Sequence, residues 1–561
     1  MLAAIVILIG VVVVSKVLRH MLAVVVMSMA VVFAFAIAPG TARAADTGAI
    51  TVDGTVATRY DAYQLFSATV VDDADADQKV ATDVAWANDT VRQAALPVLH
   101  DAGLDNSAST AQEAAEWMNG DGHMTTALAT KLARAICRSG VPSVALNAGT
   151  VAELPSGYWL IVADDDAIAQ GEAGTAPIMA LVGGSAVTVK PKAATPKVAK
   201  HVLEDSTAAW QKAADATVAD DLYWRLSATV PAGLTAYDTY AVQFVDTMGA
   251  GLDPSKVAAS MRVYVAAGAD GGFDAVLAGK DGRAGTEPAK GWTDITAQCG
   301  VSVDGKTFTV RTGDLIAALG GADAFTAGAR VVAVYNAPLS SACNHGIAKG
   351  NPNEVYLRYP RSPFADQSGD AGFTRTPSDD ACAYTWGLSL IKRSSSDDKP
   401  LTGAKLRIID DRGRILTTDG SWSTDADACV TTGADGHVEL SGVDAGVYTV
   451  EEVAAPKGYT AFEGKRTVTV TAEGLDVKQV AVAKPKVTVS AESPLRVDTA
   501  DAGTGSIELS VLNTPSKEAS RGFMPSTGDR TLVLVAVLAA IGVAVIVVAL
   551  VIKRGGGRRE K

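Results

Sequence analysis

Two trios of polar residues in this 561-residue sequence lie on strand faces that otherwise carry apolar side chains. Each trio has a lysine, an acid and an asparagine in that order along the chain: Lys200, Asp246 and Asn353, then Lys392, Glu452 and Asn513. A strand turns successive side chains to opposite faces, so alternation alone predicts that all six point toward a core. Since three such groups are costly to bury without partners, we expect each trio to meet in one site.

A lysine, an acid and an asparagine that are buried together can cross-link a chain. Burial lowers the pKa of an amine and raises that of a carboxylic acid, so a neutral lysine can face a protonated acid. The amine then attacks the asparagine carboxamide, the acid (Asp246 or Glu452) polarises its carbonyl and shuttles protons, and ammonia leaves. Each amide would close a long loop, which the entropic model for disulfides values at roughly 4 to 5 kcal/mol.

Two alternatives stay open for these residues. Asn351 lies two residues before Asn353 with the same parity, so it is a second candidate partner for Lys200. Each lysine can also end its strand and extend its amine to water, while each asparagine caps a turn. The recurrence of the same three residue types in the same order favours the buried sites.

The six residues require six strands to position them. The apolar residues that share their faces are Val198 and Val202, Val242 and Phe244, Val355, Leu357 and Tyr359, Trp386, Leu388 and Leu390, Tyr448 and Val450, and Ile507, Leu509 and Val511. Short alternating stretches with glycine-rich turns fill residues 189–364 and 382–516, a pattern typical of β-sandwiches. Residues 365–381, rich in Gly, Ser, Asp and Pro, are predicted to be the linker between them.

Residues 46–188 are predicted to form a first domain that also contains helices. Alternation predicts strands over residues 49–56 and 60–70, and further strands are expected over 157–163 and 178–182. Ser109 with Gln112 resembles a capping box that opens a helix through Met118, and a second helix is expected over residues 125–138. The predicted fold class is therefore mainly β, with short helices in the N-terminal domain.

The first stretch, residues 1–44, has the layout of a secretory signal peptide. An apolar run over residues 22–38 follows basic residues and precedes a small-residue site, so we expect cleavage after Ala44. A further apolar run lies upstream, and translation starts either at Met1 or at Met21. The body of the protein is predicted to be exported.

The C-terminal end carries three parts in a fixed order. They are a pentapeptide of Met524, Pro525, Ser526, Thr527 and Gly528, an apolar segment over residues 531–552, and a basic tail over residues 553–561. The segment is long enough to cross a bilayer core of roughly 30 Å as a helix, and the tail is expected to stay cytoplasmic. This order resembles the cell-wall sorting signal of Gram-positive surface proteins, with a methionine in place of the usual leucine. The resemblance implies that a sortase cleaves after Thr527 and passes its carbonyl to an amine; an ordinary single-span protein is the alternative.

Five cysteines follow the signal, and oxidised pairs are expected outside the membrane. Their spacing suggests disulfides between Cys299 and Cys343 and between Cys382 and Cys429. Cys137 is left over in a helical run, where we expect a buried small hydrophobe. No Cys-x-x-Cys motif points to zinc or redox chemistry.

Composition and motifs exclude several classes of function. The formal net charge of −13 argues against nucleic acid, which demands clustered Lys and Arg. The six histidines form no His-Glu-x-x-His, and Gly-x-Ser-x-Gly and phosphate-binding loops are missing, so no turnover enzyme is predicted. Asp73, Asp75 and Asp77 resemble the start of a calcium loop without its glycine and closing glutamate, so no metal and no cofactor are predicted.

Two further stretches carry a family resemblance. The E-box pattern of Cna B-type domains is matched by Tyr448, Val450, Glu452, Ala455, Pro456, Gly458 and Tyr459, and the motif after their first strand by Leu401, Thr402, Gly403 and Ala404. Residues 189–364 resemble the isopeptide-forming fimbrial domain, with Asp246, Gly251 and Leu252 as its acidic motif. With its two ends, the chain resembles the shaft (backbone) pilins of sortase-assembled pili. The resemblance implies tandem Ig-like or Cna B-type β-sandwiches with intramolecular Lys–Asn isopeptide bonds.

Polymerising pilins need a lysine that captures the threonine of the next subunit. In that family it lies in a Tyr-Pro-Lys-Asn-like motif, and here Lys192 follows Pro191, which keeps the segment extended. We therefore assign Lys192 as the acceptor; Lys190 competes with it, and both would otherwise be solvated linker lysines. The implied partners are a sortase, further copies of the chain, minor pilins, peptidoglycan and a host surface ligand.

The function predicted is that of a major structural subunit of a covalent pilus, exported and anchored to the cell wall. The alternative is a wall-anchored, minor or tip adhesin that binds a host ligand and accepts no further subunit. A usable Lys192 favours the shaft.

Overall fold

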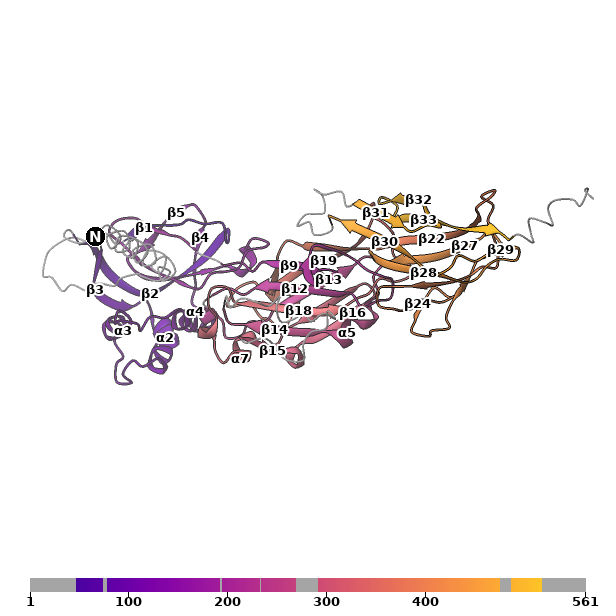
Figure 1. Ribbon diagram of the computed structural model, residues 1–561. Helices are drawn as coiled ribbons and strands as arrows, with labels where there is room; N and C mark the ends of the chain where they lie inside the picture. The colour runs from indigo at the N-terminus through magenta and orange to yellow at the C-terminus, as the bar shows by residue number, and fades with distance from the viewer. Residues whose placement is uncertain are drawn as a thin grey trace, which may run out of the picture.

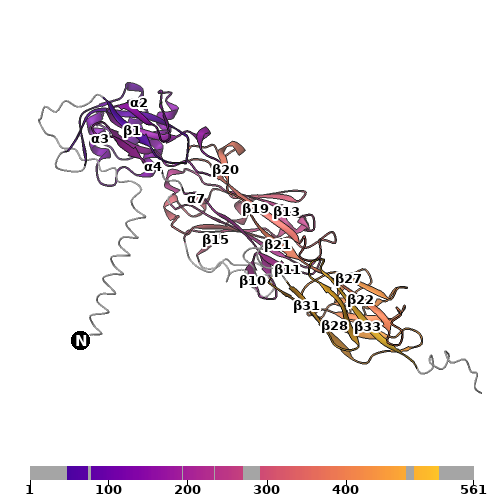
Figure 2. The same cartoon turned by 90° about the horizontal axis from the view of Figure 1, so that it is seen from above.

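The computed structural model describes residues 47–73, 78–191, 194–232, 234–268, 291–474 and 486–516. These residues form three units that follow one another in a row (Figure 1). The row is also elongated when it is seen from above (Figure 2). The first unit is purple, the second magenta and pink, and the third orange and yellow. Strands dominate, so the predicted mainly β fold class is confirmed.

The first unit contains two sheets. The larger one runs β3 (Lys79–Trp86), β2 (Arg59–Asp72), β6 (Gly157–Ala163) and β7 (Ile178–Val182), with β4 (Val144–Asn147) also on β2; the smaller one runs β5 (Val151–Pro155), β1 (Thr47–Val52) and β8 (Val187–Val189). One face of the larger sheet packs on the smaller sheet around Tyr60 and Trp159. The other face packs on helices around Phe66 and Leu132.

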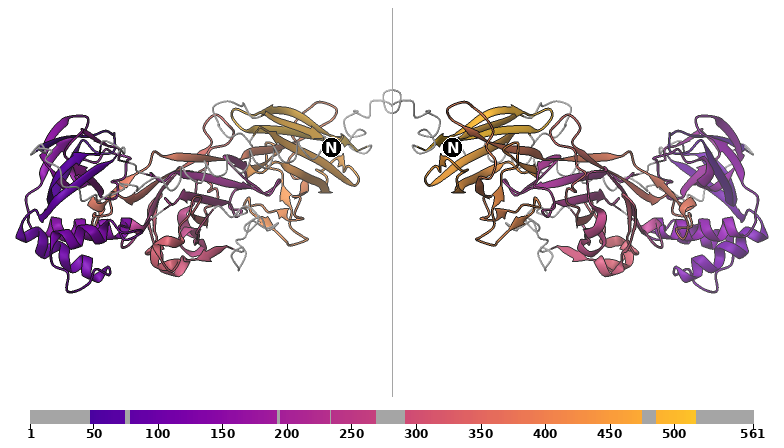
Figure 3. Two further views of the ribbon diagram at one scale, coloured as in Figure 1. Left: turned by 90° about the vertical axis from the view of Figure 1, so that its left-hand side faces the viewer. Right: turned by 90° about the vertical axis from the view of Figure 1, so that its right-hand side faces the viewer.

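Three helices cover that second face: α2 (Asp89–Asp101), α3 (Ala111–Met118) and α4 (Thr126–Arg138). They lie together on one side of the strands in the left-hand view of Figure 3. The capping box of α3 is formed by Thr110 and Glu113, one residue later than Ser109 and Gln112, which the sequence suggested. Both pairs fit the motif, and the Glu113 carboxylate accepts from two backbone N–H groups at 2.9 and 3.0 Å.

The middle unit is a sandwich of two sheets. One runs β10 (Ala209–Gln211), β9 (Val198–Glu204), β12 (Tyr223–Thr229), β18 (Arg330–Asn336), β14 (Arg262–Ala266) and β15 (Trp292–Asp294); the other runs β11 (Ala213–Asp215), β21 (Asp379–Tyr384), β19 (Asn351–Pro360), β13 (Gln243–Met248), β17 (Thr307–Arg311) and β16 (Gly300–Asp304), with β20 (Phe373–Arg375) on β19. The short helices α5 (Val257–Ser260) and α7 (Leu315–Ala318) lie on connections between strands. Buried side chains of both sheets, such as Trp224, Phe244 and Leu357, form one core.

The predicted linker, residues 365–381, takes part in this sandwich. It contains β20, which pairs with β19, and the start of β21, which pairs with β19 and β11. The sequence predicts a linker here because neither strand shows an apolar alternation. Strand β20 is only three residues long, and β21 begins with Asp379 and Asp380.

The third unit is also a two-sheet sandwich. One sheet runs β27 (His437–Val443), β22 (Trp386–Ser394), β33 (Ser506–Pro515) and β29 (Tyr459–Thr460), with β32 (Leu495–Asp501) on β33; the other runs β25 (Trp422–Ser423), β24 (Ile415–Leu416), β23 (Lys405–Ile409), β28 (Gly446–Ala454), β30 (Lys465–Glu473) and β31 (Lys486–Ala491), with β26 (Val430–Thr431) on β23. Trp386, Leu406 and Leu509 are among the buried residues of its core. The first strand, β22, and the last, β33, are parallel neighbours, and Ser394 lies opposite Asn513.

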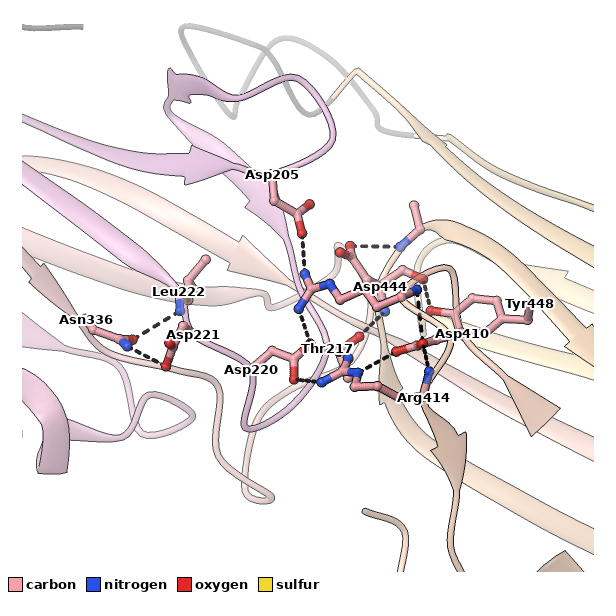
Figure 4. A network of polar contacts seen from close by, with 12 residues as sticks. Asp205, Thr217, Asp220, Asp221, Leu222, Asn336, Asp410, Arg414, Asp444 and Tyr448 are labelled. Carbon is pink, nitrogen blue, oxygen red and sulfur yellow. Dashed lines mark hydrogen bonds and ion pairs between the residues drawn. The ribbon is translucent and has the colours of Figure 1, made fainter. Parts of the chain in front are cut away.

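An arginine-rich ion-pair network joins the middle unit to the third (Figure 4). Arg414 donates to both carboxylate oxygens of Asp220 at 2.7 Å and to Asp410 at 2.7 Å. Arg412 forms ion pairs with Asp205 at 2.7 Å and with Asp220 at 3.0 Å. Because the arginines belong to the third unit and Asp205 and Asp220 to the middle one, these bonds hold the two units together.

Acidic side chains lie next to this network, away from water. Asp215 accepts hydrogen bonds from the indole N–H of Trp386 at 2.6 Å and from the backbone N–H of Ala445 at 3.0 Å. Glu204 accepts from the backbone N–H of Asp215 at 3.1 Å. Burial, and then the nearby Asp215 carboxyl, raise the pKa of Glu204 to about 7. The junction therefore holds buried carboxyl groups that keep a proton to higher pH than exposed carboxyl groups do.

Within the described ranges, no helix is both long enough and apolar enough to cross a bilayer. The predicted signal peptide 1–44, the sorting pentapeptide 524–528, the apolar segment 531–552 and the tail 553–561 lie outside those ranges. Lys192 also lies outside those ranges. The same holds for Asp75 and Asp77, two of the three aspartates that resemble the start of a calcium loop.

Candidate functional site

The first trio meets in the core of the middle unit. Lys200 on β9, Asp246 on β13 and Asn353 on β19 have no exposed surface. The Lys200 amine forms a hydrogen-bonded ion pair with Asp246 Oδ2. It also donates to the hydroxyl of Tyr335 on β18 at 2.9 Å. The structure thus brings the lysine and the acid into direct contact.

The Tyr335 hydroxyl links Asn353 to this pair. It accepts a hydrogen bond from Asn353 Nδ2 at 2.9 Å and donates one to Asp246 Oδ2 at 3.0 Å. The second carboxylate oxygen of Asp246 and the side-chain carbonyl of Asn353 are buried, and neither has a hydrogen-bond partner among the described residues. The carbonyl that the amine would attack is therefore a buried acceptor that no hydrogen bond occupies.

The electrostatics of this cluster favour a shared proton. Burial lowers the pKa of Lys200 to about 8, although the Asp246 carboxylate opposes the shift. Burial raises the pKa of Asp246, against the opposing effect of Lys200 and the Tyr335 hydroxyl. The rings of Trp224 and Tyr335 lie 5.4 Å from the amine and stabilise it by cation–π contact while it is charged. The two shifts bring the neutral amine and the protonated acid closer in free energy to the ion pair.

Asn351, the alternative partner, lies in a different set of contacts. Its side chain accepts from the backbone N–H of Asn344 at 2.9 Å and donates to the carbonyls of Asn344 and Ala383 at 2.9 and 3.1 Å. A methyl group added at Gly251 would meet the Asn351 carbonyl at 2.1 Å, so the glycine is needed for this close approach. Asn351 therefore fastens a loop, and Asn353 is the asparagine that faces Lys200.

The second trio meets in the core of the third unit. The Lys392 amine on β22 lies 2.5 Å from the side-chain carbonyl oxygen of Asn513 on β33, and 3.1 Å from Glu452 Oε1 on β28. Asn513 Nδ2 donates to the same Glu452 oxygen at 2.8 Å. The other Glu452 oxygen accepts from the backbone N–H of Phe462 at 2.9 Å. All three functional groups are in direct contact.

The environment of Lys392 matches that of Lys200. Both its side chain and that of Glu452 have no exposed surface. Burial lowers the pKa of Lys392 to about 8, and the Glu452 carboxylate opposes the shift. The amine lies 5.3 Å from the centre of the Phe462 ring. A lysine with a lowered pKa, held against an amide carbonyl, is a nucleophile in position.

The structure adds Tyr335, which sequence reasoning missed. It shares a strand face with Val331 and Ala333, so parity alone places its hydroxyl in the core. A buried hydroxyl usually finds a polar partner, and that expectation is the signal that could have found it.

The two predicted disulfides are not formed, since all five cysteines are free thiols. Cys382 lies on β21 of the middle unit, whereas Cys429 lies just before β26 of the third, so the spacing paired residues of different units. Cys299 and Cys343 both border the middle core, one before β16 and the other between β18 and β19. Cys137 is exposed, not buried as predicted, because it follows the last buried position of α4.

No group of His, Cys, Asp and Glu side chains suited to a metal ion occurs among the residues that the structure describes. Lys192 and Thr527, which are predicted to be joined in polymerisation, lie outside them. The neighbouring Lys190 is described: its amine lies 3.8 Å from Asp53, and its side chain is 71% exposed.

Comparison with known proteins gives a family match for the third unit. Residues 387–485 match the SpaA family model, described as a prealbumin-like fold domain. The trypsin-resistant surface T6 protein of Streptococcus pyogenes serotype M6 is 28% identical over 120 residues, which are 20% of this chain and 20% of that protein. The matched part thus spans about a fifth of the length of that curated relative.

Solved structures of pilins also resemble the chain. The T6 backbone pilin of serotype M6 Streptococcus pyogenes matches 84% of this chain and 99% of its own at 14% identity, with a TM-score of 0.47. The major pilin SpaD of Corynebacterium diphtheriae matches 84% of this chain and 98% of its own at 14% identity, with a TM-score of 0.41. Residues 387–485 therefore match the SpaA family, and the chain as a whole is similar to the T6 backbone pilin and the major pilin SpaD.

Proposed function

We propose that this protein is the major structural subunit of a covalently polymerised cell-surface pilus. The observation that carries the proposal is the pair of buried lysine–acid–asparagine clusters, one in each sandwich. A soluble binding module has no need to bury three such groups twice, whereas a fibre under load gains from cross-links. The SpaA-type domain and the similarity to backbone pilins support the same function.

Within each cluster we propose an isopeptide bond, Lys200–Asn353 in the middle unit and Lys392–Asn513 in the third. The lysine Nζ forms a bond to the asparagine Cγ, the Cγ–Nδ2 bond breaks, and one ammonia leaves. Asp246 and Glu452 accept the proton that Nζ loses and return one for the departing nitrogen. The protein reacts once with itself, so it is no enzyme in the turnover sense.

Polymerisation is proposed to join Thr527 of one copy to Lys192 of the next through a sortase. Lys192 follows β8, and the exposure of the nearby Lys190 supports an accessible segment at the edge of the first unit. In this scheme residues 1–44 direct export, residues 531–552 hold the precursor in the membrane, and the sorting pentapeptide 524–528 is cut during assembly. The finished polymer is attached to peptidoglycan and carries minor pilins.

The domain layout that accompanies this proposal is an N-terminal domain over residues 46–188, a fimbrial sandwich over 189–364 and a Cna B-type sandwich over 382–516. Residues 365–381 connect the two sandwiches in sequence, and together with residues 382–384 they add strand pairs to the first of them.

The function is tested by expressing the full-length protein with its sortase and separating wall extracts on a denaturing gel. We expect a ladder of covalent multimers that disappears in Lys192→Arg, because arginine is not a nucleophile at neutral pH. Lys190→Arg is the matched control and should keep the ladder. A ladder that persists in Lys192→Arg would contradict the acceptor assignment. A wild-type protein that stays monomeric would instead favour the alternative, a minor or tip adhesin that binds a host ligand.

A further inference from the structure

The Tyr335 hydroxyl contacts all three reactive groups of the middle cluster. Lys200 Nζ donates to it at 2.9 Å, Asn353 Nδ2 donates to it at 2.9 Å, and it donates to Asp246 Oδ2 at 3.0 Å. Its side chain is fully buried, and the ring packs edge-on against Phe308 with 4.7 Å between centres. The hydroxyl is therefore held in place by packing and by three hydrogen bonds.

Among the described residues of the third unit, no hydroxyl is recorded in a hydrogen bond with the cluster's reactive groups. There the Glu452 carboxylate itself accepts from Asn513 Nδ2 at 2.8 Å and lies 3.1 Å from the lysine amine. In the middle unit the acid is an aspartate, which is one methylene shorter. The tyrosine oxygen stands between that shorter acid and the amide nitrogen of Asn353.

We propose that Tyr335 is a catalytic residue of the middle cluster, whose hydroxyl relays a proton from Asp246 to the departing nitrogen of Asn353. The inference rests on the proposed isopeptide chemistry and deepens it. It gives the formation of the Lys200–Asn353 bond one catalytic residue that has no counterpart in the formation of the Lys392–Asn513 bond.

The proton balance of the step closes without any further reactant. Asp246 begins protonated and the Lys200 amine begins neutral. Nζ bonds to Asn353 Cγ; Asp246 then passes its proton to the Tyr335 oxygen while the Tyr335 hydroxyl gives its own proton to Nδ2, and the Cγ–Nδ2 bond breaks. Nζ gives one proton to the Asp246 carboxylate that is left. Ammonia leaves, and the acid and the tyrosine end in their starting states.

The protonation of Tyr335 suits this role. Burial, and then the nearby Asp246 carboxylate, raise its pKa well above the ordinary value, so the hydroxyl keeps its proton. A relay needs a group that can accept and donate at the same moment, which a neutral hydroxyl does.

The test follows cross-linking in the full-length chain made by cell-free synthesis and sampled over time. Peptide mapping and intact mass give the rate at each site separately, so the Lys392–Asn513 bond is an internal control in the same molecule. We expect Tyr335→Phe to slow the Lys200–Asn353 bond by about 100-fold or more, the usual contribution of a positioned proton-transfer group. The rate of the Lys392–Asn513 bond should not change.

Two further variants distinguish a proton relay by the Tyr335 hydroxyl from an effect of the packing of a buried tyrosine. Tyr359→Phe removes another buried hydroxyl on β19, one that donates to the Gly171 carbonyl at 2.7 Å, and it should leave both rates unchanged. Adding Asp246→Glu to Tyr335→Phe should restore the middle bond at least in part, because the longer acid can reach Asn353 as Glu452 reaches Asn513.

Three results would overturn the assignment. They are an unchanged rate in Tyr335→Phe, an equal loss in Tyr359→Phe, and no recovery when the acid is lengthened. A wild-type chain that loses no ammonia at either site would instead refute the proposed cross-links themselves, so the two failures are distinguishable.

Discussion

The two clusters hold the same functional groups but distribute them differently between the sheets. In the middle unit the acid and the asparagine belong to one sheet, and Lys200 reaches them from the other. In the third unit the lysine and the asparagine belong to one sheet, and Glu452 reaches them from the other. The first proposed bond therefore ties two sheets together, and the second ties two neighbouring strands.

The choice between Asn353 and Asn351 gives a prediction at the scale of single residues. Asn353→Ala should leave a mass deficit of one ammonia instead of two and lower the free energy of unfolding by about 5 kcal/mol, from the lost loop constraint. Asn351→Ala should keep both bonds and lower that energy by about 1–3 kcal/mol, since it leaves buried backbone groups unpaired. Intact mass and urea unfolding measure the two effects. Loss of the middle bond in Asn351→Ala alone would reverse the assignment.

Parity predicted which lysines and asparagines are buried, because one polar residue in an apolar alternation is visible in a strand of seven residues or more. It could not decide between Asn351 and Asn353, since both are buried and only the register of β19 against β13 separates them. The sequence did not mark Tyr335 as part of the cluster, for a related reason. A tyrosine among valines is ordinary core, and its polar neighbours come from strands far away in the sequence.

Strand β21 shows how an element positions the chemistry. The neighbour β10 pairs with β9 only from Val202 onward, so the backbone N–H of Lys200 lies beyond the end of that ladder. The Asp379 carboxylate accepts this N–H at 2.7 Å and also pairs with the Lys212 amine. Asp379 thereby holds β9 in place at the lysine of the middle cluster.

Removal of that carboxylate should loosen the strand. We expect Asp379→Ala to lower the free energy of unfolding by about 1–3 kcal/mol, because the N–H of Lys200 loses its partner. Asp380→Ala is the matched control: its side chain is exposed, and only its backbone carbonyl contacts Lys212, so little change is expected. Urea unfolding of both variants compares them. Equal stability of the two would show that β21 does not hold β9 through Asp379.

At this scale the sequence predicted the strands whose residues are mostly apolar. The bounds of β6 and β7 agree with the prediction, whereas β20 and the start of β21 fall in the predicted linker. Short strands made of polar residues are stabilised by the sheet edge that they join, and that edge is formed by residues remote in sequence. Local composition therefore cannot reveal them.

The junction between the middle and third units makes the whole molecule sensitive to pH. Burial raises the pKa of Glu204 to about 7 and also raises that of Asp215. The pKa of Asp444, which contacts both units, is raised as well by burial and by Asp215. A carboxyl whose folded pKa is raised stabilises the fold below its unfolded pKa and loses that contribution as pH rises through the folded value.

We therefore expect the junction to weaken between about pH 5 and pH 8, by about 3 kcal/mol or less for Glu204. Hydrogen-exchange protection factors of β11 and of residues 444–445, which correct for the intrinsic rate at pH 5 and at pH 8, report this weakening. Glu204→Gln removes the titrating group, keeps a polar side chain of the same size and should flatten the pH dependence. The ion pairs of Arg412 and Arg414 persist across this range, so they stabilise the junction equally at both pH values. Protection factors that are equal at the two pH values, or lower at pH 5 than at pH 8, would contradict the prediction.

The parallel neighbours β22 and β33 determine how the third unit would carry tension. A pull along the fibre enters the unit at the start of β22, near Trp386, and leaves at the end of β33, near Pro515. With the proposed Lys392–Asn513 bond in place, the force runs along β22 to residue 392, crosses to residue 513 and leaves. Residues 393–512, which include most of the sandwich, are then outside the loaded path. Such a unit would transmit tension without lengthening, even if its core strands opened.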